Sequence, residues 1–206
     1  MANGTLAASQ IEMLSQSGTG ITTIVPPATD TNRTLTLPDS TGTVATLGTS
    51  LTLATAVAST SGTSVDFTSI PSWVKRITIT FVGVSSNGTS RKIVQLGDSG
   101  GFENTGYLGA STVAGSATPG GYAATDGFVM NFFAAADVAH GSMTINLVDL
   151  ASNTWASNHT LGLTSAFAVF GGGSKSLSAT LTQIRITTQN GTDAFDAGTI
   201  NIMYEG

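Results

Sequence analysis

The chain has 206 residues, of which only 9% are charged, and its formal net charge is −5 at pH 7. A protein that tracks nucleic-acid phosphates would carry a basic patch, so this balance argues against nucleic acid as a partner. Cysteine is absent, which excludes a cysteine nucleophile, a Cys-ligated zinc site and a disulfide framework.

Hydroxyl-bearing residues dominate the composition. Serine and threonine together make 57 residues, and 34 of these are threonine, which favours strands. We therefore expect an all-β chain. The N-terminus lacks the basic and apolar regions of a signal peptide, and no stretch approaches the ~20 apolar residues of a membrane span. We expect a protein that is made in a cytoplasm and does not insert into a membrane by itself.

The first fifty residues contain no aromatic residue and few large apolar ones. Residues 7–16 fit a short helix, residues 21–28 fit a strand ended by two prolines, and residues 34–47 fit a strand, a turn and a second strand. Two such strands cannot support themselves. We therefore predict that residues 1–50 form an extended, weakly structured segment, which is stabilised by packing against the following domain or against other copies of the chain.

Residues 51–206 show the apolar alternation of half-buried strands. The clearest strand places three residues on one face, namely Ile77, Ile79 and Phe81. The dipeptide Asn87-Gly88 follows and is typical of two-residue hairpin turns. This part of the chain is therefore predicted to fold as one β domain.

Turn signals recur along the rest of the domain. Further strands are predicted at residues 91–96, 127–133, 142–150, 154–156, 160–170, 177–186 (with a turn or bulge inside it) and 199–204. The glycine-rich run at residues 171–175 is interpreted as a turn, and so is Asn190-Gly191. About eight strands, with a turn signal every ten or so residues, indicate an antiparallel β-sandwich, for which a jelly-roll-like topology is one option.

One segment has the sequence pattern that surrounds the nucleophile of a serine hydrolase. Residues 97–101 read Gly-Asp-Ser-Gly-Gly, as around the nucleophile of chymotrypsin-like proteases. In that order the histidine base precedes the serine, whereas His140 and His159 both follow Ser99. Ser99, Asp149 and His159 would satisfy the order of an α/β hydrolase, but no helix is predicted after the glycines. We interpret the segment as a glycine-serine loop and expect no enzyme.

Metal and phosphate sites are also weakly supported. Asp137 and His140 are three residues apart, but no third ligand is near them in sequence. Asp193 and Asp196 are better explained as turn or capping residues than as calcium ligands. The glycine-rich run at residues 171–175 lacks the spacing of a phosphate loop. No metal and no cofactor are expected.

Two stretches combine aromatic rings with short polar side chains, as sugar-binding sites do. Residues 152–159 offer four candidate contacts, namely Trp155, Asn153, Asn158 and His159. Residues 101–122 offer two more, Tyr107 and Tyr122. Neither stretch carries enough Lys or Arg for a strongly anionic ligand, so the hypothesis is a neutral polysaccharide bound by loops. The alternative is that Trp155 points into the sandwich and its polar neighbours face water.

Several segments carry a resemblance to a known class of domain. They are residues 61–79 (SGTSVDFTSIPSWVKRITI), 81–90 (FVGVSSNGTS), 106–109 (GYLG) and 190–205 (NGTDAFDAGTINIMYE). Together they resemble a domain that recurs at the C-terminal end of tail-fibre-like and other appendage proteins of tailed bacteriophages and prophages. The resemblance covers roughly residues 55–206. Residues 35–47 (LTLPDSTGTVATL) are similar to short segments found in the necks of many phage fibres.

The resemblance implies a structural protein of the virion, typically a homotrimer. Residues 1–50 would attach to other virion proteins, and the β domain, residues 51–206, would face outward toward host-surface polysaccharide. It brings no catalytic residues. Since only about fifty residues precede the β domain, a short tail fibre or spike that attaches to the host is the expected function. A head fibre, collar or capsid-decoration protein is the first alternative, and a polysaccharide- or ester-cleaving hydrolase is the second.

Overall fold

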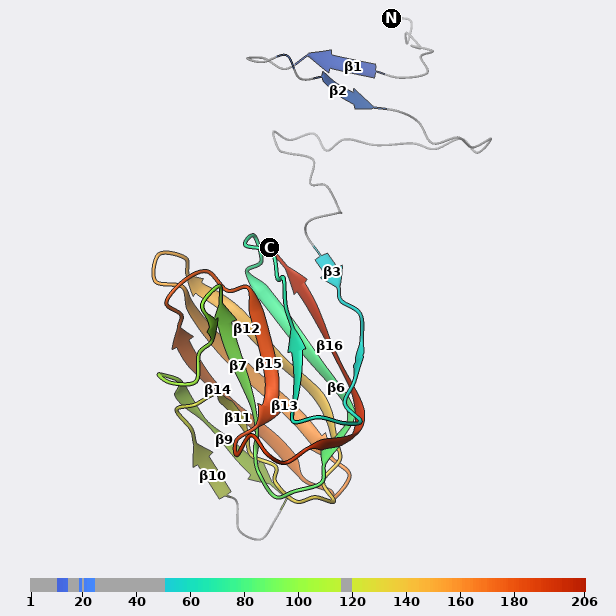
Figure 1. Cartoon of the computed structure of the whole chain (residues 1–206), viewed down its shortest axis with the longest axis vertical. Helices are drawn as coiled ribbons and strands as arrows, with labels where there is room; N and C mark the ends of the chain where they lie inside the picture. Colours follow the sequence, from blue (N-terminus) through green and yellow to red (C-terminus); the bar gives the residue numbers. More distant parts are fainter. Residues whose placement is uncertain (1–10, 15–18, 20, 25–50, 116–119) are drawn as a thin grey trace, which may run out of the picture. The chain divides into compact units, whose positions relative to one another are not determined.

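The computed structural model describes residues 11–14, 19, 21–24, 51–115 and 120–206 (Figure 1). These residues form strands and turns, and none of them lies in a helix, which confirms the predicted all-β class. Accordingly, the described part of the chain holds no helix long and apolar enough to cross a membrane. By its internal contacts the chain divides into two units, Met1–Val44 and Ala45–Gly206.

The described residues of the first unit include one antiparallel pair of strands. Strand β1 (Ile11–Leu14) pairs with β2 (Ile21–Ile24), so that Ile11 lies opposite Ile24. The strand predicted from residue 21 is confirmed, whereas the helix predicted for residues 7–16 is wrong over β1. A single helix of ~10 residues is marginal in water, whereas pairing with β2 satisfies the backbone of this segment. The strands predicted at residues 34–47 lie outside the described residues.

The second unit contains two antiparallel sheets. In its described residues the larger sheet has nine strands, in the order β10-β9-β14-β13-β12-β6-β16-β3 with β4 beside β16. Their bounds are β3 Leu51–Leu53, β4 Val57–Ala58, β6 Arg76–Ser86, β9 Leu108–Ala114, β10 Gly120–Ala123, β12 Ala139–Asp149, β13 Thr154–Leu163, β14 Ala168–Ser176 and β16 Phe195–Glu205. The smaller sheet runs β11-β7-β15-β5 with β8 beside β7. Its bounds are β5 Ser64–Phe67, β7 Lys92–Asp98, β8 Gly101–Phe102, β11 Phe128–Met130 and β15 Gln183–Thr188.

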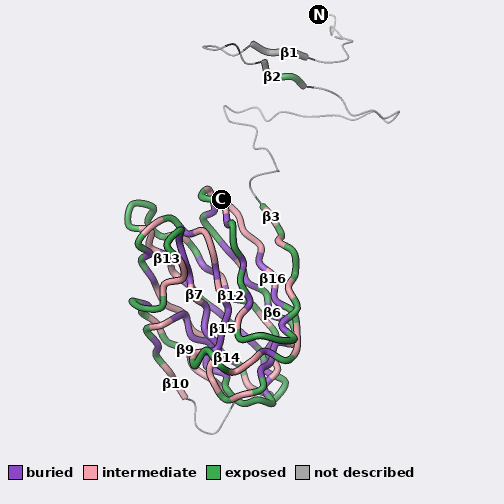
Figure 2. The backbone as a smooth tube through the Cα atoms, viewed as in Figure 1, coloured by how far each residue is buried: buried purple, intermediate pink, exposed green. Residues whose placement is uncertain are grey.

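The core lies between the two sheets, as the buried segments of Figure 2 show. The larger sheet contributes alternate residues such as Ile79, Met143 and Ile202, each no more than 2% exposed. The smaller sheet contributes Leu96 and Ile186, which are fully buried. Because each such side chain gains about 1.5–3 kcal/mol on burial, this layer dominates the stability of the unit. The predicted antiparallel β-sandwich is therefore confirmed.

The predicted hairpin at Asn87-Gly88 is wrong, because β6 and β7 belong to different sheets. Residues 87–91 instead cross from one sheet to the other and lie beside the crossing that joins β15 to β16. The Asn87 N–H donates to the Ala194 carbonyl at 2.9 Å, and the Ala194 N–H donates to Asn87 Oδ1 at 2.9 Å. A side chain at Gly88 would overlap the Asp193 carboxylate, so this glycine lets the two connections approach each other.

The glycine run at residues 171–173 is part of strand β14 rather than a turn. There Gly171 pairs with His159 of β13, and Gly173 pairs with Gly109 of β9. A Cβ added to Gly173 would lie 2.6 Å from the Leu108 carbonyl oxygen, a distance that real side chains do not tolerate. The glycines therefore allow β14 to pack closely between its neighbours, which local turn signals could not indicate.

Candidate binding site

The six predicted contact residues do not come together in the fold. Three of them lie inside the sandwich, namely Trp155 (3% exposed), His159 (3%) and Tyr107 (1%). Asn158 alternates with His159 on β13 and therefore faces solvent. Asn153 lies in the turn before β13 with a φ of 47°, and Tyr122 is half-buried on β10. A ligand at the surface cannot reach the three buried rings, so these cannot form the stacking platform that the sequence suggested.

Tyr107 shows what the buried aromatics do instead. Its hydroxyl accepts a hydrogen bond from the Leu96 N–H at 2.6 Å and donates to the Glu103 carbonyl at 3.1 Å. Its ring packs edge-on against Phe128, with 5.0 Å between the ring centroids. Burial raises the pKa of this phenol. Tyr107 therefore anchors the loop after β8 to the core of the sandwich.

Residues 97–101, the segment with the serine-hydrolase pattern, form a tight hairpin. Gly97 pairs with Phe102 and Asp98 with Gly101, which leaves Ser99 and Gly100 as the turn between β7 and β8. The Asp98 carboxylate accepts hydrogen bonds from the Ser178 hydroxyl at 2.6 Å and the Gly100 N–H at 2.7 Å, which lower its pKa. Neither described histidine hydrogen-bonds to Ser99. The segment lacks the strand-to-helix turn and the base that a nucleophile requires.

A serine and a histidine do meet elsewhere, inside the sandwich. Ser111 Oγ lies 2.9 Å from His159 Nε2, and it also accepts the Asn131 N–H at 3.1 Å. His159 Nδ1 is buried and has no hydrogen-bond partner among the described residues, so no carboxylate orients the ring. Burial lowers the pKa of His159 to about 4. The pair is closed to solvent, and no described carboxylate completes a triad with it.

Asp137 and His140 are the two residues that the sequence analysis considered as metal ligands and found to lack a third. His140 Nδ1 accepts the Gly83 N–H at 3.2 Å. The Asp137 carboxylate accepts the Ala134 N–H at 3.0 Å and the Ser165 hydroxyl at 2.9 Å. Within the described ranges, no three His, Asp or Glu side chains come close enough to hold a metal ion. These two side chains therefore stabilise turns and strand ends.

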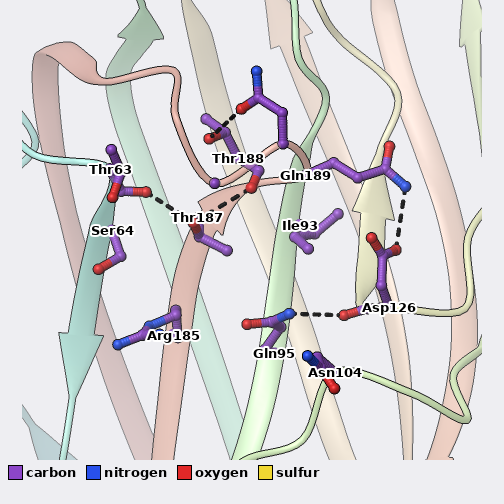
Figure 3. Close-up of a pocket in the computed structure, with 12 residues that line it drawn as sticks. Thr63, Ser64, Ile93, Gln95, Asn104, Asp126, Arg185, Thr187, Thr188 and Gln189 are labelled. Atoms are coloured by element: carbon purple, nitrogen blue, oxygen red, sulfur yellow. Dashed lines mark hydrogen bonds between the residues drawn. The ribbon is translucent and has the colours of Figure 1, made fainter.

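A groove of about 300 Å³ crosses the outer face of the smaller sheet (Figure 3). It lies on this face because Gln95 and Arg185 alternate along their strands with the core residues Leu96 and Ile186. Polar side chains that line the groove include Gln95, Asn104, Asp126, Arg185, Thr187 and Gln189. They are supplied by β7, β15 and three connecting segments, and the groove is polar rather than apolar.

Asp126 holds two amide side chains of the groove in place. Gln95 Nε2 donates to the Asp126 backbone carbonyl at 2.9 Å, and Gln189 Nε2 donates to the Asp126 carboxylate at 3.2 Å (Figure 3). These bonds use amide nitrogens, and neither amide oxygen accepts a hydrogen bond from the described residues, so both can accept from a ligand. Asn104, which is exposed, makes no hydrogen bond through its side chain to the described residues. The groove therefore presents fixed acceptors and one free amide.

The positive charge beside the groove is neutralised. Arg185 donates to the Asp66 carboxylate through Nε at 2.8 Å and through Nη2 at 2.7 Å. The guanidinium also stacks on the Phe102 ring, 4.2 Å from its centroid. Because the Arg185 charge is already paired with the Asp66 carboxylate, an anionic ligand would gain little binding energy from it. The groove is suited to an uncharged ligand that is rich in hydroxyl groups.

This groove was not predicted from the sequence, although Asn104 lies within residues 101–122, one of the two stretches proposed there for sugar binding. Its residues come from five separated segments, and each is an ordinary polar residue in its own surroundings. The outward positions of β15 gave a weak signal, since Arg185 and Thr187 alternate with buried isoleucines. Only the pairing of β15 with β7 brings these positions beside Gln95.

Comparisons with known proteins identify no relative of this chain. No protein-family model, no curated protein and no solved structure matches it.

Proposed function

We propose that this protein is a non-enzymatic structural protein of a bacteriophage particle. In this proposal it forms a short tail fibre or spike that attaches to the host surface, and the groove on the smaller sheet binds a neutral polysaccharide. The observation that carries the binding function is the groove itself, with amides oriented by Asp126 and its arginine already paired. The resemblance of residues 55–206 to phage appendage domains supports the place on a virion.

The chemistry of the groove fits a neutral sugar. Sugar hydroxyls donate to amide oxygens and accept from amide N–H groups, and Gln95, Gln189 and Asn104 supply both kinds of partner. Because the two glutamines are already held by Asp126, less side-chain freedom is lost when a ligand binds. A small number of well-placed polar groups is the usual source of specificity in such sites.

The same groove argues against a glycan-cleaving enzyme. Glycoside hydrolysis ordinarily requires two carboxyl groups that face each other across the scissile bond. Asp126 is one carboxylate at the groove, and both oxygens of Asp66, a candidate for the second, already accept hydrogen bonds from Arg185 Nε and Nη2. The buried Ser111 and His159 cannot act on a surface ligand either. Binding without cleavage is therefore the function that we propose.

The attachment to the particle is assigned to residues 1–50. This segment has no aromatic residue and few large apolar ones, so three copies sharing one core would stabilise it better than one copy alone. We propose a homotrimer whose N-terminal segments contact other virion proteins and whose β domains point outward. A head fibre, a collar protein or a decoration protein would use the same arrangement at another place on the particle.

A glycan array probed with the purified full-length chain tests the binding function. We expect signals on neutral polysaccharides that weaken by about three- to tenfold for Asn104→Ala and for Gln189→Ala, since each variant removes one or two hydrogen bonds to the ligand. Asn146→Ala is the matched control, because Asn146 is exposed on the larger sheet. Unchanged binding by both groove variants, or no neutral glycan bound, would contradict the proposal.

The place on the virion is tested separately, by electron microscopy of particles labelled with an antibody against residues 51–206. Labels at the tail tip or baseplate, at a distance from the particle surface, are expected. Labels on the head or collar would support the first alternative. An epitope tag before Met1 should stay hidden in intact particles, whereas a tag after Gly206 should be accessible. The reverse accessibility would refute the proposed polarity.

A further inference from the structure

A second cavity, of about 410 Å³, lies beside strands β9 and β10. Its wall is mainly apolar and aromatic, and three polar side chains interrupt it. The residues used below are Arg91, Asn131, Phe133, Asp137 and Phe167, all of which line it. It shares no lining residue with the groove on the smaller sheet. Its ligand chemistry can therefore be tested independently of the proposed function.

The guanidinium of Arg91 is held rigidly at this cavity. It lies over the Tyr122 ring, 3.7 Å from the ring centroid, and 4.7 Å from the centroid of Phe133. Its Nε donates to Asn131 Oδ1 at 2.7 Å. Asn131 is itself fixed, because its Nδ2 donates to the Gly120 carbonyl at 2.8 Å. Both the plane and the rotation of the guanidinium are therefore set before any ligand binds.

Within the described part of the chain, the terminal nitrogens of Arg91 have no hydrogen-bond partner. Its side-chain hydrogen bond uses Nε, and no acidic side chain of the described residues forms an ion pair with it. A half-buried arginine without a carboxylate partner is unusual in a chain with 12 acidic residues. Two parallel N–H groups on a fixed plane match the two oxygens of a carboxylate.

The other charges at the cavity limit the ligand to a single negative charge. Asp137 has both oxygens engaged, by the Ala134 N–H and the Ser165 hydroxyl. Lys92, which is fully buried, lies within electrostatic reach of Asp137, Asp193 and Asp196 together, so it does not neutralise Asp137 alone. Arg91 is then the cation lining the cavity that no described carboxylate pairs with. A phosphate dianion would meet one cation and the nearby Asp137, so a monoanionic carboxylate fits better.

The apolar part of the wall indicates what carries the carboxylate. Phe133 is 41% exposed, and Phe167 lines the same cavity. Aromatic walls of this kind bury the apolar face of a ring-sized ligand while a few polar groups fix its orientation. We propose that this cavity binds a uronic acid, a saturated sugar ring whose carboxylate pairs with Arg91 and whose apolar face lies on the phenylalanine rings.

Titrations followed by NMR test this site on the full-length protein with three probes. Methyl β-D-glucuronide is expected to bind with roughly millimolar affinity and to shift the Arg91 Nε–H and Asn131 amide signals. Methyl β-D-glucoside, which carries a hydroxymethyl group in place of the carboxylate, should bind at least about tenfold more weakly. Acetate, which lacks the ring, should also bind at least about tenfold more weakly.

Variants of Arg91 complete the test. Arg91→Gln should abolish saturable binding of the glucuronide, and Arg91→Lys should weaken it by about three- to tenfold because it loses the planar fork. Arg76→Gln is the matched control, since Arg76 is an exposed arginine paired with Glu205. If Arg91→Gln does not fold, as judged by its melting curve, the lysine variant decides. Equal binding of glucuronide and glucoside, equal binding of acetate, unaltered binding by the folded Arg91 variants, or no saturable binding of glucuronide would each overturn the proposal.

Discussion

Ser111 Oγ and His159 Nε2 lie 2.9 Å apart in the interior of the sandwich, and the other ring nitrogen of His159 has no hydrogen-bond partner in the described part of the chain. Ser111 lies on β9 and His159 on β13, and Gly171 of β14 pairs with both and lies between them in the sheet. A Cβ on Gly171 would come within 2.8 Å of His159 Cε1, so the glycine makes room for the ring. The pair therefore depends on three neighbouring strands.

The stability of the protein should fall as the pH is lowered from 6.5 to 4. Above 6.5, His159 is neutral in both the folded and the unfolded chain. Between 6.5 and about 4 the unfolded chain binds a proton that the folded chain excludes, because burial lowers the folded-state pKa. The free energy of unfolding should drop by about 3 kcal/mol across this window. Urea unfolding measured at several pH values checks it.

His159→Gln should remove most of this pH dependence, whereas His140→Gln, on the same sheet, should keep it. Carboxylates with lowered pKa values act at lower pH: the contribution of Glu103 is lost only as the pH falls below about 4.5. Asp98 has a pKa below its ordinary 3.8 because it accepts the Ser178 hydroxyl, so its contribution is lost only as the pH falls below that value. A slope between pH 6.5 and about 5 that persists in His159→Gln would contradict the assignment.

Trp155→Ala should destabilise the sandwich without directly removing a ligand contact. Trp155 is 3% exposed and packs in the main core, so truncation leaves a large cavity and costs about 3–5 kcal/mol. Its indole Nε1 has no described hydrogen-bond partner, so Trp155→Phe should cost less because no hydrogen bond is lost. Thermal melting measures both. Weaker glycan binding by Trp155→Phe protein that is fully folded would revive Trp155 as a contact residue.

Gly198→Ala should be strongly destabilising. Gly198 has a φ of +98°, and a Cβ there would lie 2.5 Å from the Gly83 carbonyl carbon and oxygen. Backbone strain and overlap with the neighbouring strand together should cost more than about 2 kcal/mol. Gly162→Ala is the matched control, because a Cβ at Gly162 would meet nothing within 4 Å. Denaturant unfolding should show this variant unchanged or slightly stabilised, and equal losses would contradict the steric argument.

The full-length chain should be a trimer in solution. Residues 1–50 have too little large apolar surface to form a core in one copy. Light scattering should give three times the chain mass of 20.8 kDa, and deletion of residues 1–50 should lower that mass. A mass near 20.8 kDa for the full-length chain would refute the trimer.

The sequence determined the class of the fold and the strands with strong alternation. Ile77, Ile79 and Phe81 specify a half-buried strand by themselves, because side chains in a strand alternate between the two faces with a period of two. The same holds for Met143 and Ile145 of β12. These features are local, so they could be predicted without knowing which strands pair.

Only the tertiary structure decided which segments meet. Asn87-Gly88 has the local chemistry of a hairpin, but the partners of β6 and β7 are distant in sequence and lie in different sheets. Residues 101–122 carry no lysine or arginine, so a neutral ligand followed from the sequence. The fold then places Arg91, from outside that stretch, over Tyr122. Long-range strand pairing, which alternation does not encode, decides such contacts, and it therefore decides both candidate sites.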